Sequence, residues 1–140
     1  MTCRRTVVEP VAGAAPSQTL GILLLDGSFE RAHYALVLAV SAAALDRPVV
    51  LFATNGGLHA LCRDWSGLAG SEADAVLRAR GVAGFAVLQD TLVPLGVRLL
   101  ACEAGLRAIA LPADALLEAV EPAGVPTFLS AVGGGQMLSI

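Results

Sequence analysis

VRLLACEAGLRA, residues 97–108, joins an apolar run to a cysteine and then to a sequence with helical character. Residues 97–101 have the continuous apolar pattern of a strand that is buried on both faces of a parallel sheet. Residues 102–111 then predict a helix. Cys102 therefore stands where a buried strand passes into a helix, which makes it the first candidate for a functional group.

Further apolar runs bounded by turn residues predict more strands, and helical patterns lie between them. The predicted strands are 19–25, 47–54, 97–101 and 136–140, with one optional strand before the last helix. The predicted helices are 29–46 (capped by Ser28), 58–65, 84–96, 102–111, 113–120 and 124–135. Residues 66–76 predict a polar surface loop that runs on into a helix ending near residue 81. Strands separated by helical crossovers form a mostly parallel sheet with helices on both faces, so this order predicts a three-layer α/β fold of the flavodoxin-like class.

The length and composition suit one domain that associates with itself. The 140 residues divide into a flexible arm at residues 1–18 and a single domain at residues 19–140. Hydrophobic residues make up 56% of the chain, above the roughly 45–50% of typical domains. The apolar run Tyr34–Leu45 is much shorter than the about 20 residues of a membrane-spanning helix, so no span is predicted. The surplus of apolar residues instead predicts a homo-oligomer.

Charge and cysteine usage narrow the class of protein further. The net charge is −3, and the nine basic residues are scattered arginines, so no nucleic-acid partner is predicted. The first residues lack the apolar core of a signal peptide, which predicts a cytoplasmic protein whose three cysteines stay thiols. Neither CxxC nor GxGxxG occurs, and the two histidines lie far apart in the sequence, so we expect no metal and no organic cofactor.

Small or polar residues follow each of the first three predicted strands. In open α/β sheets, ligands bind beyond the carboxyl ends of the strands. If these strands are neighbours, Asp26, Asn55 and Cys102 meet in one crevice. The other residues predicted to line this pocket are Gly27, Gly56, Gly57, His59 and Glu103.

Two interpretations of Cys102 are open. A helix N-terminus carries about half a positive charge and free N–H groups, and both favour the thiolate, which is the nucleophilic form. Glu103 opposes this effect, because a neighbouring carboxylate disfavours a second anion. Alternatively, Cys102 is an inert thiol that packs as a small apolar group. Cys62 has helical spacing to Leu58 and Leu61 and is interpreted as structural.

The other pocket residues also have two interpretations each. The NGG sequence at residues 55–57 is either a turn that offers N–H groups to an anion or a plain strand stop. His59 is either a proton donor in the crevice or a packed or surface histidine. Asp26 is either a functional carboxylate or a residue that serves its own turn.

In three segments the chain resembles the DsrE/DsrF/DsrH-like family of small sulfur-handling proteins. The segments are LDGSFERAHYALVLAVSAAALDRPVVLFATNGG (25–57), LGVRLLACEAGLRA (95–108) and VEPAGVPTFLSAV (120–132). The resemblance implies a flavodoxin-like fold and assembly into trimers or hexamers. It also implies that a cysteine at the position of Cys102 carries sulfur as a persulfide and passes it to the cysteine of a partner protein. Residues 63–82 do not match the family, and this segment is a candidate for setting the partner or substrate.

Three functions are compatible with these observations. The first is a cytoplasmic sulfur carrier or sulfurtransferase-like protein that holds sulfane sulfur on Cys102. The second is a non-catalytic subunit for small-ligand binding or assembly, in which Cys102 is inert and Asn55 or Gly56 is essential. The third is a redox sensor with a disulfide between Cys62 and Cys102, which requires their Cα atoms to lie within about 7 Å of each other.

Overall fold

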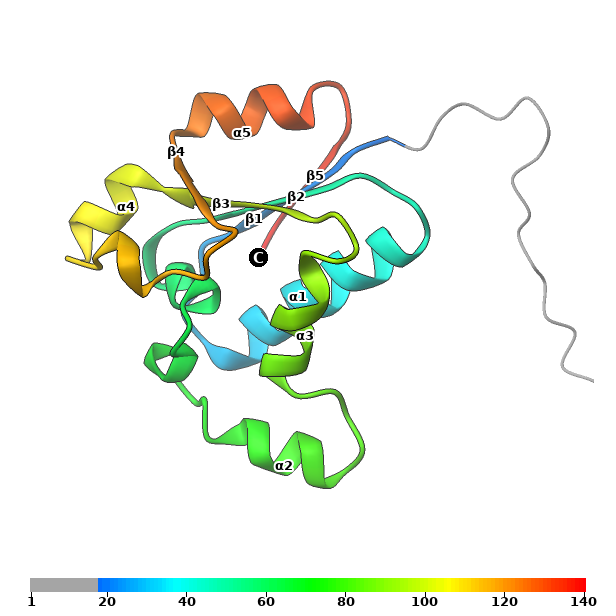
Figure 1. Cartoon of the computed structure of the whole chain (residues 1–140), viewed down its shortest axis with the longest axis vertical. Helices are drawn as coiled ribbons and strands as arrows, with labels where there is room; N and C mark the ends of the chain where they lie inside the picture. Colours follow the sequence, from blue (N-terminus) through cyan, green and yellow to red (C-terminus); the bar gives the residue numbers. More distant parts are fainter. Residues whose placement is uncertain (1–17) are drawn as a thin grey trace, which may run out of the picture.

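A five-stranded parallel sheet runs through residues 18–140, the part of the chain that the computed structural model describes (Figure 1). Neighbouring strands are parallel throughout. In spatial order the strands are β4 (Glu121–Ala123), β3 (Arg98–Cys102), β2 (Val49–Ala53), β1 (Leu20–Leu24) and β5 (Gln136–Ser139). The predicted arm, with Cys3, lies outside the described residues except for Gln18.

Helices cover both faces of this sheet (Figure 1). In chain order the α-helices are α1 (Phe29–Ala44), α2 (Ala73–Ala79), α3 (Phe85–Leu92), α4 (Glu103–Ala108) and α5 (Val125–Val132). Helices α1 and α3 lie on one face and α5 on the other, whereas α2 lies beyond α1 and α3, away from the sheet. The prediction of a three-layer, flavodoxin-like α/β fold is therefore confirmed.

Two apolar clusters hold the sheet between its helical layers. Because side chains alternate along a strand, neighbouring residues of β2 enter different clusters. Leu51 packs in the larger cluster with Leu36 of α1. Phe52 stacks on Phe128 of α5, with ring centroids 5.0 Å apart. All of β2 is buried, which explains why its sequence is apolar without interruption.

The predicted helix at residues 113–120 is wrong. Only η3, a 3₁₀ turn at Ala113–Ala115, is helical there. Leu116 is extended and forms an antiparallel bridge with Cys62, and the N–H of Leu117 donates to the carbonyl of Leu61 at 2.9 Å. This pairing buries Leu116 and takes the place of intrahelical hydrogen bonds. The chain then enters β4, the optional strand of the prediction.

The helix predicted at residues 58–65 is also displaced. A 3₁₀ helix, η1 (Asn55–Leu61), begins within the NGG sequence, and a second, η2 (Trp65–Gly67), follows it. Asn55 has φ 50°, a left-handed conformation that asparagine tolerates better than most residues. NGG therefore starts a helical turn as well as ending β2. The predicted helices at 84–96 and 102–111 end early, at Leu92 and Ala108.

The segment 63–82, which the resemblance leaves unmatched, is anchored on α1 and α3. Asp74 of α2 is buried, and its Oδ1 accepts a hydrogen bond from the backbone N–H of Phe85 at 2.7 Å. Nε2 of His33 in α1 lies 2.9 Å from the carbonyl oxygen of Ala83. These contacts hold the first turn of α2 against the start of α3, and the chain that follows α2 against α1.

None of the helices in residues 18–140 is both long and apolar enough to cross a membrane. Nor do three His, Cys, Asp or Glu side chains gather there in a group that could hold a metal ion.

Removing the Asp74 carboxylate tests the anchor of α2. We expect Asp74→Ala to lower the free energy of unfolding by about 1–3 kcal/mol, because it leaves the buried N–H of Phe85 without its acceptor. Urea denaturation measures the effect. Asp90→Ala, an exposed change on α3, is the control and is expected to change stability by less than about 0.5 kcal/mol. Equal effects of the two substitutions would contradict the anchoring role.

Candidate functional site

The residues that follow β1, β2 and β3 lie side by side at the carboxyl edge of the sheet. The strand registers pair Leu24 with Ala53 and Ala53 with Ala101. Cys102 follows Ala101 in β3. Asp26 lies two residues after Leu24, in the loop that follows β1. The loops of β1 and β3 are thus two strand spacings, or about 10 Å, apart. The prediction that these loops lie at one edge of the sheet is confirmed. That their side chains act together in one site stays a prediction.

Cys102 ends β3 and caps α4. Its Sγ accepts a hydrogen bond from the backbone N–H of Gly105 at 3.4 Å. Its side chain lies on the α5 face of the sheet, in the cluster that contains Leu100 and Ala123, and the residue is 8% exposed. The N–H donor is the kind of contact that stabilises an anionic sulfur. The burial is what a packed, inert thiol would also show.

Thr54 and Gly105 are neighbours of Cys102 that the sequence reasoning did not select. A Cβ atom on Gly105 would lie 2.7 Å from Oγ1 of Thr54 and 3.3 Å from the Cβ of Cys102. The threonine hydroxyl and the cysteine therefore flank the same glycine. Thr54 was included in the predicted strand 47–54, where a β-branched residue is unremarkable. Its position directly after a buried strand was the one available signal.

The glycines of the first two loops allow backbone to pack directly on backbone. A Cβ on Gly27 would lie 3.0 Å from the Cα of Gly56. A Cβ on Gly57 would lie 2.5 Å from the carbonyl oxygen of Leu24, closer than real Cβ atoms approach a neighbour. A side chain at Gly57 collides with backbone, and one at Gly27 requires the Gly56 backbone to shift. The glycines of NGG thus have a packing role, beside an exposed Asn55.

Asp26 is engaged in its own turn. Its Oδ1 accepts a hydrogen bond from the N–H of Ser28 at 2.7 Å, and its Oδ2 lies 3.9 Å from Nε of Arg31. The hydrogen bonds from Ser28, with a smaller contribution from Arg31, hold the pKa of the Asp26 carboxyl below its usual value. This geometry supports the interpretation of Asp26 as a turn residue.

His59 faces the segment 63–82. A Cβ on Gly67 of η2 would lie 2.5 Å from Nδ1 of His59, so the ring lies directly against the Gly67 backbone. The histidine is half-buried there. This position supports the interpretation of His59 as a packed side chain.

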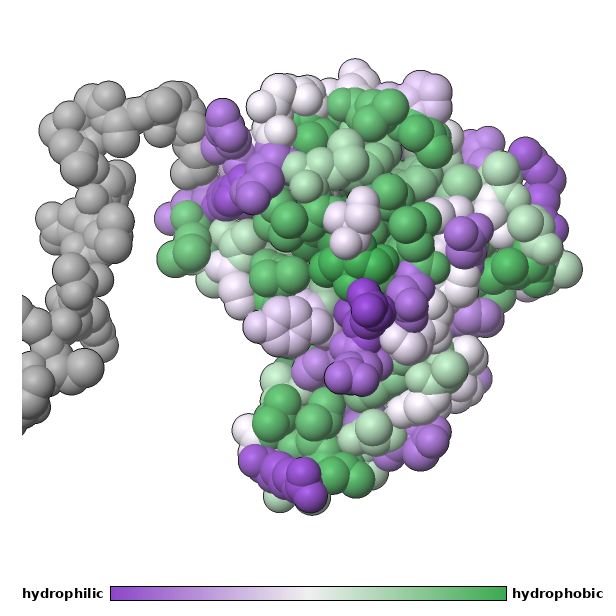
Figure 2. Space-filling view, turned by 180° about the vertical axis from the view of Figure 1, so that it is seen from behind, coloured by the Kyte–Doolittle hydropathy of each residue, from purple (hydrophilic) through white to green (hydrophobic). Residues whose placement is uncertain are grey.

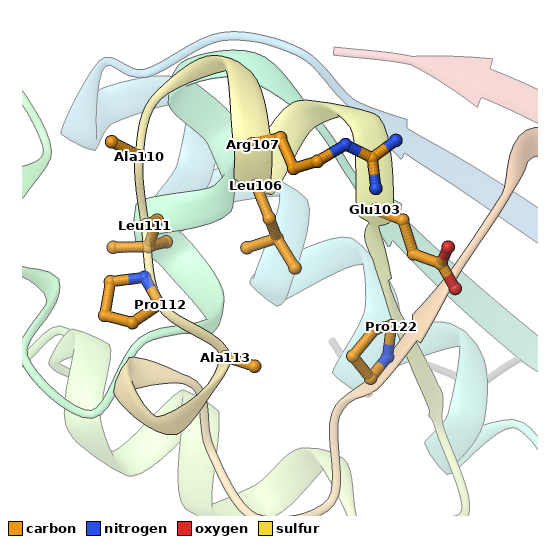
Figure 3. Close-up of a pocket in the computed structure, with 8 residues that line it drawn as sticks. All are labelled: Glu103, Leu106, Arg107, Ala110, Leu111, Pro112, Ala113 and Pro122. Carbon is orange, nitrogen blue, oxygen red and sulfur yellow. The ribbon is translucent and has the colours of Figure 1, made fainter.

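A surface hollow of about 440 Å³ lies between α4, the loop after it and β4 (Figure 3). The charged side chains of Glu103 and Arg107 stand beside an apolar floor that includes Leu106 and Pro122. Glu103 is the one predicted pocket residue that lines this hollow, and Cys102 does not line it. The hollow is therefore distinct from the crevice predicted between the strand ends.

Cys62 is a buried thiol on the other side of the sheet from Cys102. It packs in the cluster of the α1 face, and its Sγ lies 3.5 Å from the carbonyl oxygen of Leu58. Burial, with a smaller contribution from Asp64, raises the pKa of the Cys62 thiol. A structural role fits these surroundings, and the separation by the sheet gives a disulfide with Cys102 no support.

Two solved structures are similar to this chain over most of its length. YchN from E. coli aligns with 88% of this chain and 99% of its own, with a TM-score of 0.68 and 14% sequence identity. The fold is that of YchN. MTH1491 from Methanobacterium thermoautotrophicum, a protein of unknown function, aligns with 89% of this chain and 100% of its own, with a TM-score of 0.56 and 21% identity.

The sequence itself has no such match: no protein-family model and no curated protein matches it. At these levels of identity the two structures establish the fold of the chain. Its activity has to be argued from the residues at the edge of the sheet.

The close packing at Gly57 predicts that one methyl group added there destabilises the fold. We expect Gly57→Ala to lower the free energy of unfolding by about 1–3 kcal/mol, because the new Cβ collides with the backbone of Leu24. Gly134→Ala is the matched control, since a Cβ on Gly134 meets no atom within 4 Å. Thermal or urea unfolding of the two variants compares them. Gly57→Ala as stable as the control would contradict the packing role.

The two described cysteines should differ in reactivity. We expect iodoacetamide to alkylate Cys102 faster than Cys62 in the folded protein at mildly alkaline pH. The raised pKa of Cys62 lowers its thiolate fraction, and Cys62 is 2% exposed whereas Cys102 is 8% exposed. Timed quenching and peptide mass spectrometry measure both rates, with urea-unfolded protein as the control for intrinsic reactivity. Faster alkylation of Cys62 would overturn this assignment.

Proposed function

We propose that this protein is a sulfur carrier of the DsrE/DsrF-like type, with Cys102 as the group that holds the sulfur. The observation that carries the proposal is the position of this thiol. It ends β3, an inner strand of the sheet, and its sulfur accepts a hydrogen bond from the N–H of Gly105, at the first turn of α4. The fold shared with YchN and MTH1491 and the sequence segments that resemble the family support it further.

The proposed reaction moves one sulfur atom in two displacement steps. The Cys102 thiolate attacks a sulfane sulfur of the donor, such as a polysulfide, and the donor S–S bond breaks as its remainder leaves with the electron pair. A Cys–S–S⁻ persulfide results. A thiolate of the acceptor then attacks the outer sulfur, and Cys102 leaves as a thiolate. No electrons are gained or lost overall, so no redox cofactor takes part.

The neighbours of Cys102 suggest how such a sulfur is held. The N–H of Gly105 donates to the thiolate, and the hydroxyl of Thr54, across the same glycine, is a second donor for the bound sulfur. The limited exposure of Cys102 restricts the donor to a small sulfane compound or to a partner's persulfide presented on an extended segment. Asp26 accepts a hydrogen bond from Ser28, and His59 packs against Gly67. Neither residue is therefore assigned a proton-transfer role.

The same proposal covers the cellular location, the oligomeric state and the acceptor of the protein. The family resemblance and the apolar composition support a cytoplasmic homo-oligomer, a trimer or a hexamer, that hands sulfur to an acceptor protein. Such relays need no metal ion. The segment 63–82 is a candidate for contacting that acceptor, since α2 lies away from the sheet (Figure 1).

A second candidate function is a non-catalytic binding subunit. It is favoured by the hollow between α4 and β4, which is separate from Cys102 and has both charged and apolar lining residues. In that case the thiol is a packing group, and function survives Cys102→Ser. A change in the lining, such as Arg107→Ala, would remove function instead.

The persulfide can be detected directly. We expect the protein, incubated with thiosulfate or polysulfide and measured by intact-mass spectrometry, to gain about 32 Da, one sulfur atom. The adduct should be absent from Cys102→Ser and present in Cys62→Ser, the matched control. It should disappear when a thiol acceptor is added. No adduct on the wild-type protein, or an adduct that persists in Cys102→Ser, would exclude Cys102 as the carrier.

A further inference from the structure

A hollow of about 340 Å³ lies between α1 and α2. The first two turns of α1 and one side of α2 line it, with the side chains of Phe29, Glu30, His33, Tyr34, Ala73 and Leu77. Seen from behind, the lobe that contains α2 projects from the lower end of the molecule and carries apolar side chains beside charged ones (Figure 2). One wall of the hollow thus comes from the segment 63–82, which the family resemblance does not cover.

The floor of the hollow is aromatic and firmly packed. Phe29 and His33 are 2% and 7% exposed, and their ring centroids lie 5.5 Å apart. Phe29 also packs against Trp65 and Phe85, with centroid distances of 5.9 Å and 5.7 Å. Sites for small molecules are typically of this kind: a preformed, mostly apolar cavity with a few well-placed polar groups.

His33 offers a hydrogen-bond acceptor to this hollow. Its Nε2 lies 2.9 Å from the carbonyl oxygen of Ala83. A carbonyl oxygen only accepts, so in the neutral imidazole Nε2 carries the proton and Nδ1 carries the lone pair. Within residues 18–140 Nδ1 has no hydrogen-bond partner, yet no side-chain nitrogen or oxygen there is both buried and unpartnered. Nδ1 is therefore open to solvent, and the hollow is the space that His33 lines.

Glu30 adds a negative charge to the same hollow. Its side chain is exposed, and none of the ion pairs within the described residues includes it. The adjacent Arg31 is turned toward Asp26, with its Nε 3.9 Å from Oδ2. The carboxylate of Glu30 and Nδ1 of His33 both accept hydrogen bonds, and the ring face of Tyr34 attracts a cation. These groups select a ligand that is positively charged and donates hydrogen bonds.

We propose that this hollow binds a small protonated amine with an aromatic body, of the arylethylamine class. The ammonium group donates to the carboxylate of Glu30 and to Nδ1 of His33. The aromatic ring lies on Phe29, between Tyr34 and Leu77, because aromatic rings favour offset or edge-on contact with one another. An anion would be repelled by the carboxylate, and an uncharged apolar molecule would leave both acceptors without a donor.

This site is independent of the sulfur chemistry. Phe29 packs in the apolar cluster on the α1 face of the sheet, whereas Cys102 packs in the cluster on the α5 face. None of the residues assigned to the carrier site lines the hollow. Loss of amine binding and loss of persulfide formation are therefore separate results.

Phenethylamine is the probe that tests the ligand class. Trp65, the single tryptophan of the chain, reports binding by its fluorescence because its ring lies 5.9 Å from that of Phe29, and titration calorimetry measures the same Kd. We expect saturable binding, at least about tenfold tighter than that of phenethyl alcohol, which has the same body without the charge. Butylamine, which has the charge without the ring and resembles a lysine side chain, should also bind at least about tenfold more weakly. No saturable binding of phenethylamine by either method, or equal affinity for either analogue, would overturn the proposal.

Three substitutions locate the amine in the hollow. We expect Glu30→Gln to weaken phenethylamine binding about tenfold, because it removes the charge and keeps the shape. Ala73→Phe, at an exposed position in the wall, fills the hollow and should abolish binding, while urea unfolding shows that the variant is folded. Glu72→Gln, the same change at an exposed carboxylate that does not line the hollow, is the matched control and keeps the wild-type Kd. Unchanged binding in Glu30→Gln or Ala73→Phe, or an equal loss in Glu72→Gln, would place the amine elsewhere and reject the site.

Discussion

Backbone lies directly against backbone where the loops after β1 and β2 meet, and the carboxyl edge of the sheet depends on this contact. The loop at Gly27 touches Gly56, and Gly57 sits against the carbonyl of Leu24. A side chain at any of these positions would push the two loops apart. The neighbouring contact between Gly105 and Thr54 obeys the same constraint and brings α4 close to η1. Cys102 owes its surroundings to this close packing.

The two faces of the sheet are covered unequally. Among the described residues, helices α1 and α3 share one face and α5 is the one helix on the other (Figure 1). Cys102 lies on the α5 face, in the smaller of the two apolar clusters. Under this cover Cys102 is 8% exposed. Strand β5 lies at a border of the sheet where apolar side chains remain exposed.

Much of the fold could be predicted from local patterns, and the failures have identifiable causes. The strands β1, β2 and β3 were predicted because each is a buried apolar run that ends in turn residues. The helix predicted at 113–120 failed because Leu116 finds a partner in Cys62, a residue far away in the sequence. Local helical propensity loses to such pairing when the apolar side chain is buried by it. The role of Gly57 was missed for a related reason, since its neighbour, the carbonyl of Leu24, belongs to another strand.

The sequence by itself determined the alternation of strands and helices and the place of Cys102 at the end of β3, because apolar periodicity and helix starts are properties of adjacent residues. Only the tertiary structure decided the order β4-β3-β2-β1-β5, the face on which the Cys102 sulfur lies and the contact of Thr54 with Gly105. It also decided which predicted pocket residues lie elsewhere. His59, for example, packs against Gly67. These features depend on contacts between distant residues, and such contacts form only when the chain packs as a whole.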